Sequence, residues 1–408
     1  MTSSSGQLLD LDITGIAHGG TFIARHEGRV VFVSDAIPGE RVRVRITDPA
    51  PGSSAEAAAK KKFWRGETVE VLEPSPHRRA HVWPEADVSR APEDRAGGAD
   101  LGHIELSHQR TLKRQVLQEA LDKFAGAGLT APEVQAVDEG DGTGWRTRVS
   151  LHVDDDGIVG PFAARSHRVI PVSSHPLARR RVAAEALSQK NAKPGRIDLV
   201  QSADQQVHVI RRPEKGKRQP ADVIIERVGE RAFRVDADGF WQVHPRAAET
   251  LDAAVRRTLA DRVDPELTHL DLYGGVGLFA ATLADLGARQ IVTVESSRRA
   301  TEHAKHNLED VDVAAVTARV DRYLDGFSGD TKVGAVVLDP PRAGAGRAVV
   351  DGIHALKPQA ITYVACDPVA LARDLGTFRE LGWNVASLEA FDLFPHSHHF
   401  EVVALLTA

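Results

Sequence analysis

The chain of 408 residues carries a formal net charge of −6, and its 42% hydrophobic and 26% charged residues are ordinary for a globular protein of two or three domains. It has no run of 18 apolar residues and no basic segment before an apolar core at its N-terminus, which argues against a membrane span and a signal peptide. The single cysteine excludes an internal disulfide and a cysteine-rich metal site. We therefore expect a cytoplasmic, monomeric protein that does not enter a membrane.

Residues 1–75 are predicted to form a small β-barrel. Short segments with alternating side chains are separated by the turns Gly19-Gly20 and Pro38-Gly39. The expected strands are 8–16, 29–33, 41–46 and 67–71.

Residues 76–235 are predicted to form a mixed α+β central domain. Helices are expected at 106–124 and 178–190. Strands are expected at 145–153, 158–162, 207–211 and 232–235.

Residues 236–408 alternate strand and helix patterns, which predicts an α/β fold with a Rossmann-like, doubly wound parallel sheet. A terminal β-hairpin, 384–391 and 400–406, should join this sheet. The other expected strands are 268–273, 290–295, 313–318, 333–339 and 360–366.

Basic residues gather locally although the chain is acidic overall, and phosphate binding depends on local charge. A short charge run is more often a solvated face, so no cluster alone identifies an RNA-binding protein. The candidate clusters for RNA contact are Lys60–Lys62, Arg179–Arg181 and Arg211–Arg218.

Cys366 closes the apolar run 361–365 and precedes Asp367-Pro368 and a helical pattern. This places the only thiol at the carboxyl end of a strand, the edge of an open α/β sheet where ligands bind. A free cysteine is often a plain buried residue. A cofactor loop at the same edge favours covalent catalysis by Cys366 instead.

That loop is the glycine-rich segment 270–279, where a strand runs into a turn and then a helix. Glu295 ends the next strand, where a carboxylate binds ribose hydroxyls. The loop does not spell G-x-G-x-x-G, so S-adenosyl-L-methionine fits it better than a nicotinamide dinucleotide does. A purely structural turn is the alternative. The candidate cofactor-binding residues here are Asp271, Tyr273, Gly274, Gly275, Gly277 and Glu295.

Three further side chains are candidates near the cofactor. Asp339 begins the segment Asp-Pro-Pro-Arg, whose prolines stiffen a pocket wall, and it can accept hydrogen bonds from the cofactor or a base edge. Asp321 follows the third expected strand, where an adenine amino group binds. Gln242, in the segment Gly-Phe-Trp-Gln-Val-His244, can direct its carboxamide at the cofactor.

Residues 394–401 contain three histidines but predict no metal site. The segment reads as extended, so His398 and His399 should face opposite sides, and no partner cysteine exists. Glu401 begins an apolar strand at the mouth of the sheet and is a candidate base.

Together these segments resemble the 5-methyluridine RNA methyltransferases, the uracil-C5 enzymes of tRNA and 23S ribosomal RNA. Phe240-Trp-Gln, Asp271 to Gly277 and Asp339-Pro-Pro-Arg resemble three of the family's motifs. The segment Tyr363 to Asp374 and the segment 394–401 resemble its nucleophile and base motifs. Residues 1–75 resemble the TRAM domain, an RNA-binding barrel of the TRAM/OB-like kind.

The resemblance implies a chemistry. Carbon 5 of uracil is a weak nucleophile, and addition of the Cys366 thiolate at carbon 6 activates it for methylation by S-adenosyl-L-methionine. Glu401 then removes the carbon-5 proton, Asp339 orients the pyrimidine and the cofactor, and the base must be flipped out of folded RNA. The implied partner is 23S rRNA or tRNA.

The sequence also departs from the family. Many relatives carry four cysteines for a [4Fe–4S] cluster, but Gly97 to His103 resembles the cluster-binding stretch without any cysteine, so no cluster is expected. Polar contacts then have to order residues 76–110, which we expect to be more mobile than the sheet. In addition, His244 stands where the family has asparagine.

Two other functions remain open. An amino-group nucleobase methyltransferase needs no cysteine, but Arg342 stands where its Asp-Pro-Pro-Tyr motif has an aromatic residue. An RNA-binding or RNA-folding protein without catalysis would have no need of Cys366 and Glu401.

Overall fold

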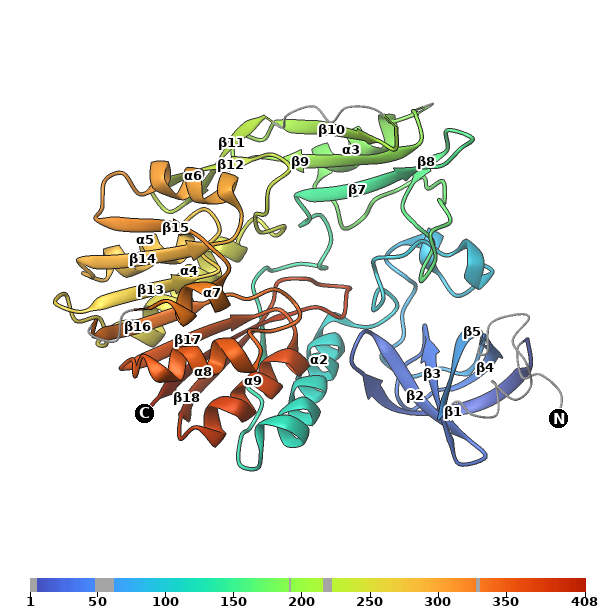
Figure 1. Cartoon of the computed structure of the whole chain (residues 1–408). Coiled ribbons are helices and arrows are strands. Elements are labelled where there is room, and N and C mark those ends of the chain that lie inside the picture. The colour runs from blue at the N-terminus through green and yellow to red at the C-terminus, as the bar shows by residue number, and fades with distance from the viewer. Residues whose placement is uncertain (1–5, 48–61, 191, 216–221, 328–330) are drawn as a thin grey trace.

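The computed structural model describes residues 6–47, 62–190, 192–215, 222–327 and 331–408. Most of the cluster Lys60–Lys62 and of the run Lys215–Arg218 lies outside these residues. Figure 1 shows a barrel and a large sheet on opposite sides of helix α2, with a smaller sheet beside them.

The N-terminal strands close into a barrel in the order β1-β2-β3-β5-β4, which confirms the predicted barrel. Strand β2 was not foreseen, although its Phe22 and Ala24 are fully buried in the barrel core. The strands are β1 (Leu8–Ala17), β2 (Thr21–His26), β3 (Arg29–Ser34), β4 (Arg41–Ile46) and β5 (Phe63–Glu73).

The middle of the chain forms a four-stranded sheet in the order β10-β9-β7-β8 and a two-stranded hairpin, β11-β12. Helix α3 (Arg180–Ser188) packs on β7, β9 and β10. The sequence predicted this mixed composition but not β9 and β11. The strands are β7 (Arg148–Val153), β8 (Val159–Gly160), β9 (Gly195–Gln201), β10 (Val207–Pro213), β11 (Val223–Val228) and β12 (Arg231–Asp236).

The large sheet has the order β15-β14-β13-β16-β17-β19-β18-β6, and its first five strands are parallel. Along β16, Val336 and Leu338 face one apolar cluster, and Ala335 and Val337 face another. Both faces are therefore covered by helices, which confirms the doubly wound, Rossmann-like fold. The strands are β13 (Thr268–Leu272), β14 (Gln290–Glu295), β15 (Val313–Thr317), β16 (Val333–Leu338), β17 (Ala360–Ala365), β18 (Asn384–Asp392) and β19 (Glu401–Thr407).

Helices cover the two faces of this sheet. Helices α4, α5 and α6 contribute to one apolar cluster, and α7, α8 and α9 contribute to the other. Their bounds are α4 (Ala247–Leu259), α5 (Leu278–Asp285), α6 (Arg298–Asn307), α7 (Val320–Asp325), α8 (Arg347–Ala355) and α9 (Pro368–Glu380).

A segment from earlier in the chain also joins this sheet, which the sequence did not suggest. Helix α2 (Leu106–Ala120) continues into η3 (Leu121–Ala125), packs against α9, and leads to β6 (Val134–Ala136), which pairs in parallel with β18. Residues 106–136 thus complete the C-terminal sheet, while the three-part division of the chain at residues 75 and 235 stays a prediction.

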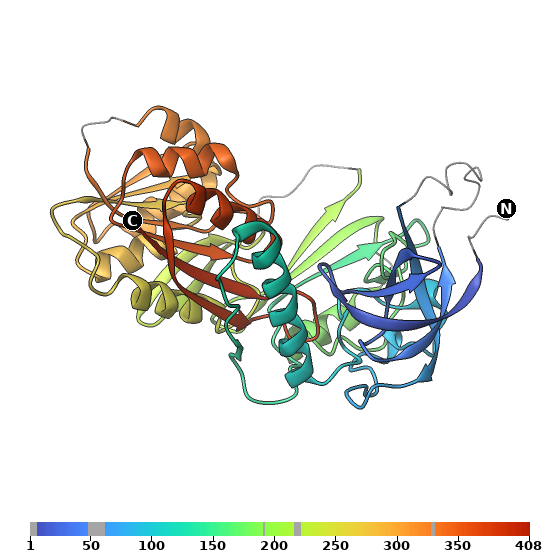
Figure 2. The same cartoon turned by 90° about the horizontal axis from the view of Figure 1, so that it is seen from below.

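Helix α2 stands between the barrel and the sheet (Figures 1 and 2). Its Leu112 and Val116 belong to the barrel core, and its Leu117 and Ala120 belong to the sheet core. One turn before Leu117, and on the same face of the helix, the Nζ atom of Lys113 donates a 2.6 Å hydrogen bond to Asp392 Oδ1 at the end of β18. The ion pair is buried, with side-chain exposures of 1% and 2%.

Among the described residues, no helix combines the length and the apolar character needed to cross a membrane.

The buried ion pair predicts a strong effect of single substitutions. Lys113→Ala should destabilise the protein by about 3–5 kcal/mol, because it leaves the Asp392 carboxylate buried without its partner. The double variant Lys113→Met, Asp392→Leu should recover much of this loss, since neither charge remains. Urea unfolding of the wild-type protein and the two variants checks this. Equal destabilisation by the single and double variants would contradict it.

Candidate active site

A cavity of about 1240 Å³ lies at the carboxyl ends of the parallel strands. It brings together residues from the C-terminal half of the chain, Trp145 and Arg146 from just before β7, and Asp100. The sequence-predicted site residues that line it are Gln242, Tyr273, Gly275, Glu295, Asp321, Asp339, Cys366 and Glu401.

Cys366 directly follows β17 and is half-buried at the wall of this cavity. Asp367 begins helix α9 as its N-cap: its Oδ1 accepts hydrogen bonds from the N–H groups of Val369 (3.0 Å) and Ala370 (2.9 Å). Burial, followed by the charges of Glu401 and Asp339, raises the pKa of the Cys366 thiol to about 12, and Arg342 opposes this rise. The thiol of the free protein is therefore neutral.

Glu401 is the first residue of β19 and is 4% exposed. Its buried Oε2 has no hydrogen-bond partner among the described residues. Burial and the nearby charge of Asp339 raise the pKa of Glu401 well above its usual range, while burial and Asp271 raise the pKa of Asp339 to about 7. An unpaired buried carboxyl group of this kind demands an explanation, and a raised pKa makes its carboxylate a stronger base.

Asp271, Gly274 and Gly277 do not line the cavity but support it from behind. The Asp271 carboxylate is fully buried and accepts hydrogen bonds from Thr293 Oγ1 (2.9 Å) and the Ala280 N–H (3.1 Å). A Cβ atom at Gly274 would lie 1.9 Å from Thr293 Oγ1 and 2.5 Å from Asp271 Oδ2. Gly274 is thus needed for close internal packing, and Gly275 is the glycine of this loop that lines the cavity.

Gly275 and Glu295 form one wall of the cavity. The Gly275 N–H donates to Glu295 Oε2 (3.2 Å), and the Ser297 N–H donates to Glu295 Oε1 (2.6 Å). Gly275 has a φ of +55°, and no heavy atom lies within 4 Å of where its Cβ would stand, so its backbone is open. Tyr273 also has a left-handed φ, +63°, and Asp321 accepts two hydrogen bonds from Arg319.

Strand β7 holds the loop that carries Gln242. The N–H and the hydroxyl of Thr147 both donate to the Val243 carbonyl, at 2.8 and 2.9 Å. Arg148 Nη1 donates to the carbonyls of Ala237 (3.2 Å) and Gly239 (2.7 Å). The central part of the chain therefore fixes one side of the cavity.

The prediction that His398 and His399 face opposite sides is wrong. The segment is a turn rather than a strand, and the two ring centroids lie 3.9 Å apart. His398 Nδ1 lies 2.7 Å from Asp100 Oδ2, and the buried His396 lies 2.7 Å from the Asp141 carbonyl. Within the described residues, no three His, Cys, Asp or Glu side chains are arranged to hold a metal ion.

The sequence analysis missed several residues at this site. Trp145, Arg146 and Asp100 line the cavity, and Phe240 stands at its wall with 77% of its surface exposed. Arg146 and Asp100 are far from Cys366 along the chain, and no spacing or motif signals their approach. Phe240 lies within a segment singled out for Gln242, so its exposure alone was unforeseen.

Comparisons with known proteins agree over the length of the chain. A model of the TRAM domain matches residues 3–58, and a model described as tRNA (uracil-5-)-methyltransferase matches residues 189–408. An uncharacterized RNA methyltransferase of Streptomyces avermitilis is 39% identical, with 98% of each chain covered. The 23S rRNA (uracil(1939)-C(5))-methyltransferase of Shewanella baltica is 29% identical, covering 99% of this chain and 97% of the relative.

The fold resembles a solved structure as well. The crystal structure of the Pyrococcus abyssi tRNA (uracil-54, C5)-methyltransferase, in complex with S-adenosyl-L-homocysteine, matches with a TM-score of 0.69. The match covers 97% of this chain and 99% of that one, at 21% identity, and it shows that the two share a fold.

Alkylation of the free protein should report on Cys366 alone, because it is the only thiol. We expect the rate with iodoacetamide to rise about tenfold per pH unit up to about pH 9, since the thiolate fraction does so below a pKa of about 12. Arg342→Ala should slow the reaction further, because this guanidinium lowers the thiol pKa. Arg347→Ala, at the same cavity, is the matched control. A plateau at neutral pH would contradict the expectation.

Proposed function

The chain belongs to the tRNA (uracil-5-)-methyltransferase family, and from this premise we propose that it methylates a uridine of RNA through a covalent bond between Cys366 and carbon 6 of the base. The family consists of RNA methyltransferases that act on uracil carbon 5. RNA is therefore the macromolecular substrate. The N-terminal barrel, which matches the TRAM domain, supports RNA binding.

The cavity suits S-adenosyl-L-methionine as the methyl donor. Gly275 leaves an open backbone, and Glu295 stands at the end of β14, where a carboxylate receives ribose hydroxyls. We assign Gln242, Tyr273, Gly275, Glu295 and Asp321 to cofactor binding, with Asp271 supporting the loop. When bound, this cofactor supplies an electrophilic methyl group.

The chain's own residues do the rest. The Cys366 thiol first loses its proton to solvent. The thiolate then adds to carbon 6 of the flipped-out uracil, and the electron pair of the carbon 5–carbon 6 double bond moves onto carbon 5 and the neighbouring carbonyl. Asp339 lines the same cavity and orients the pyrimidine. Once carbon 5 carries both a methyl group and a proton, Glu401 removes the proton, the carbon 5–carbon 6 double bond re-forms, and the thiolate leaves.

A single observation supports this assignment best. Cys366, Asp339 and Glu401 share one cavity, and the buried Glu401 Oε2 has no partner among the described residues. A carboxyl group that only stabilised the fold would be hydrogen-bonded. A group that must receive a substrate proton has its acceptor oxygen free.

We expect the wild-type protein to form a complex with 5-fluorouridine-substituted RNA that survives a denaturing gel, because fluorine at carbon 5 cannot be removed as a proton. Cys366→Ala should form none and make no 5-methyluridine, while its affinity for S-adenosyl-L-homocysteine stays close to that of the wild type. A tRNA transcript and a 23S rRNA fragment, tested in parallel, distinguish the two RNA classes.

The same experiment tests the two alternatives. An amino-group methyltransferase would keep its activity in Cys366→Ala. If the protein only binds RNA, even the wild-type protein would make no 5-methyluridine and form no adduct. Either result would overturn the proposal.

Glu401→Gln should accumulate a covalent, methylated protein–RNA adduct with ordinary RNA. The base acts only after the methyl group has been transferred, so its loss blocks release rather than addition. A general base typically contributes a factor of about 10²–10⁴, so slow release of product is expected. The double variant with Cys366→Ala should show no adduct, because the bond runs through that sulfur. Wild-type turnover by Glu401→Gln without an adduct would mean that another residue removes the proton.

A further inference from the structure

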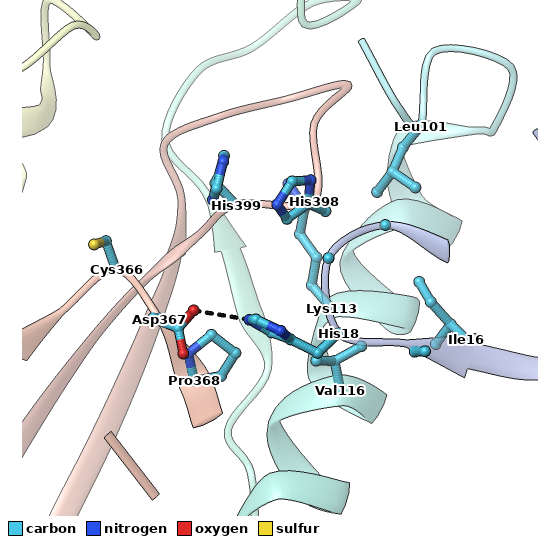
Figure 3. Close-up of a pocket in the computed structure, with 13 residues that line it drawn as sticks. Ile16, His18, Leu101, Lys113, Val116, Cys366, Asp367, Pro368, His398 and His399 are labelled. Atoms are coloured by element: carbon cyan, nitrogen blue, oxygen red, sulfur yellow. Dashed lines mark hydrogen bonds and ion pairs between the residues drawn. The ribbon is translucent and has the colours of Figure 1, made fainter. Parts of the chain in front are cut away.

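The barrel touches the loop that carries the nucleophile. His18 lies just after β1, and its Nε2 lies 2.8 Å from Asp367 Oδ2. Asp367 directly follows Cys366, and its other oxygen, Oδ1, caps helix α9. Figure 3 shows this pair beside Cys366, with the side chains of Lys113 and His398 close by. One carboxylate therefore joins the barrel to the first turn of α9.

The turn that presents His18 is held in place on its far side. Gly20 has a φ of +71°, and a Cβ atom there would lie 3.0 Å from His398 Cβ and 3.2 Å from Asp100 Cβ. On the near side, Ile16 is 2% exposed in the barrel core. Both ends of the turn are therefore fixed, so the backbone directs the His18 side chain, itself 45% exposed, toward Asp367, which is 20% exposed.

We propose that His18 is a positioning residue for the nucleophile: from the barrel, it holds Asp367 and thereby fixes the backbone that carries Cys366. The inference rests on the proposed function of Cys366. Without His18, Asp367 keeps its capping bonds but loses the contact that sets the direction of its carboxylate. The thiol then samples a wider range of positions relative to carbon 6 of the base. The barrel thus contributes to the chemical step as well as to RNA binding.

The charged surroundings agree with a stable contact. The hydrogen bond that His18 donates to Asp367 raises the pKa of His18, and burial and the positive charge of Arg373 act against this rise. In turn, the His18 hydrogen bond helps to keep the pKa of Asp367 below its usual range, although burial works in the opposite direction. Among the described residues, the other titratable groups that line the small gap between the barrel and α9 are Lys113, Cys366, His398 and His399.

The test measures the rate of adduct formation with 5-fluorouridine RNA at saturating RNA, together with the affinity for S-adenosyl-L-homocysteine. His18→Ala should lower the rate by about 10- to 100-fold, the usual effect of misplacing a reacting group by about 1 Å. His18→Gln keeps an N–H donor for Asp367 and should recover most of the rate. The cofactor affinity should stay unchanged in both variants.

Two glycine variants provide an independent test. Gly20→Ala places a methyl group against His398 and should slow adduct formation, because the turn must shift. Gly19→Ala is the matched control: its φ of +86° is equally left-handed, but no atom lies within 4 Å of the new Cβ. We expect Gly19→Ala to react at nearly the wild-type rate.

The outcomes distinguish a failure of the positioning role of His18 from a failure of the proposed function. A wild-type rate for His18→Ala at saturating RNA, with only weaker RNA binding, would overturn the positioning role while leaving the proposed function intact. If His18→Gln is as slow as His18→Ala, the positive charge rather than the hydrogen bond matters, and the positioning role is wrong. If the wild-type protein forms no adduct, the proposed function fails and this inference fails with it.

Discussion

One helix serves two hydrophobic cores, and the arrangement of the molecule depends on it. One face of α2 supplies Leu112 and Val116 to the barrel, and another face supplies Leu117 and Ala120 to the sheet. A helix presents neighbouring residues at about 100° intervals, so two such faces cannot rotate independently. Lys113 then fixes the helix against the end of β18. The barrel, the turn at 394–400 and the start of β19 are thus held in one frame, and Cys366 and Glu401 keep their relative places within it.

Several acidic side chains lie close together at the carboxyl edge of the sheet, where their negative charges repel one another. Asp271 lies within β13, and Asp339 directly follows the adjacent strand β16. Glu401 begins β19 and lines the same cavity as Asp339. Burial raises the pKa of both Asp271 and Asp339, the charge of Asp271 raises the pKa of Asp339 further, and the charge of Glu295 does the same for Asp271. Arg342 is the positive charge that lowers the pKa values of both Glu401 and Cys366. Carboxyl groups whose pKa values are raised by burial and by one another's charges cluster at functional sites, which supports the proposed role of this edge.

The sequence predicted the sheet well because its strands are continuous apolar runs buried on both faces. The five expected parallel strands agree with β13 to β17 to within one residue at each end. Strands β6 and β9 were missed because their places are set by tertiary partners: β6 has three residues and pairs with β18 from far along the chain. The sequence motifs of the C-terminal half predicted that residues such as Asp339, Cys366 and Glu401 would lie at one site, and these residues line the cavity. Arg146, Asp100 and His18 were not predicted, since only the folded chain brings them to Cys366.

The central segment shows how the chain orders a region whose relatives often use cysteines. Polar contacts do contribute, as expected: Arg95, 2% exposed, donates to Asp35 of the barrel, and Glu85 accepts from Ser173. The larger contribution is apolar and was not foreseen, because Trp83 and Trp145 pack with three alanines and Leu177. Each indole leaves its buried Nε1 without a partner among the described residues, which costs about 1–3 kcal/mol. Each indole buries about 150–250 Å², which stabilises by about 4–6 kcal/mol, so for each tryptophan the packing outweighs its one unmade hydrogen bond.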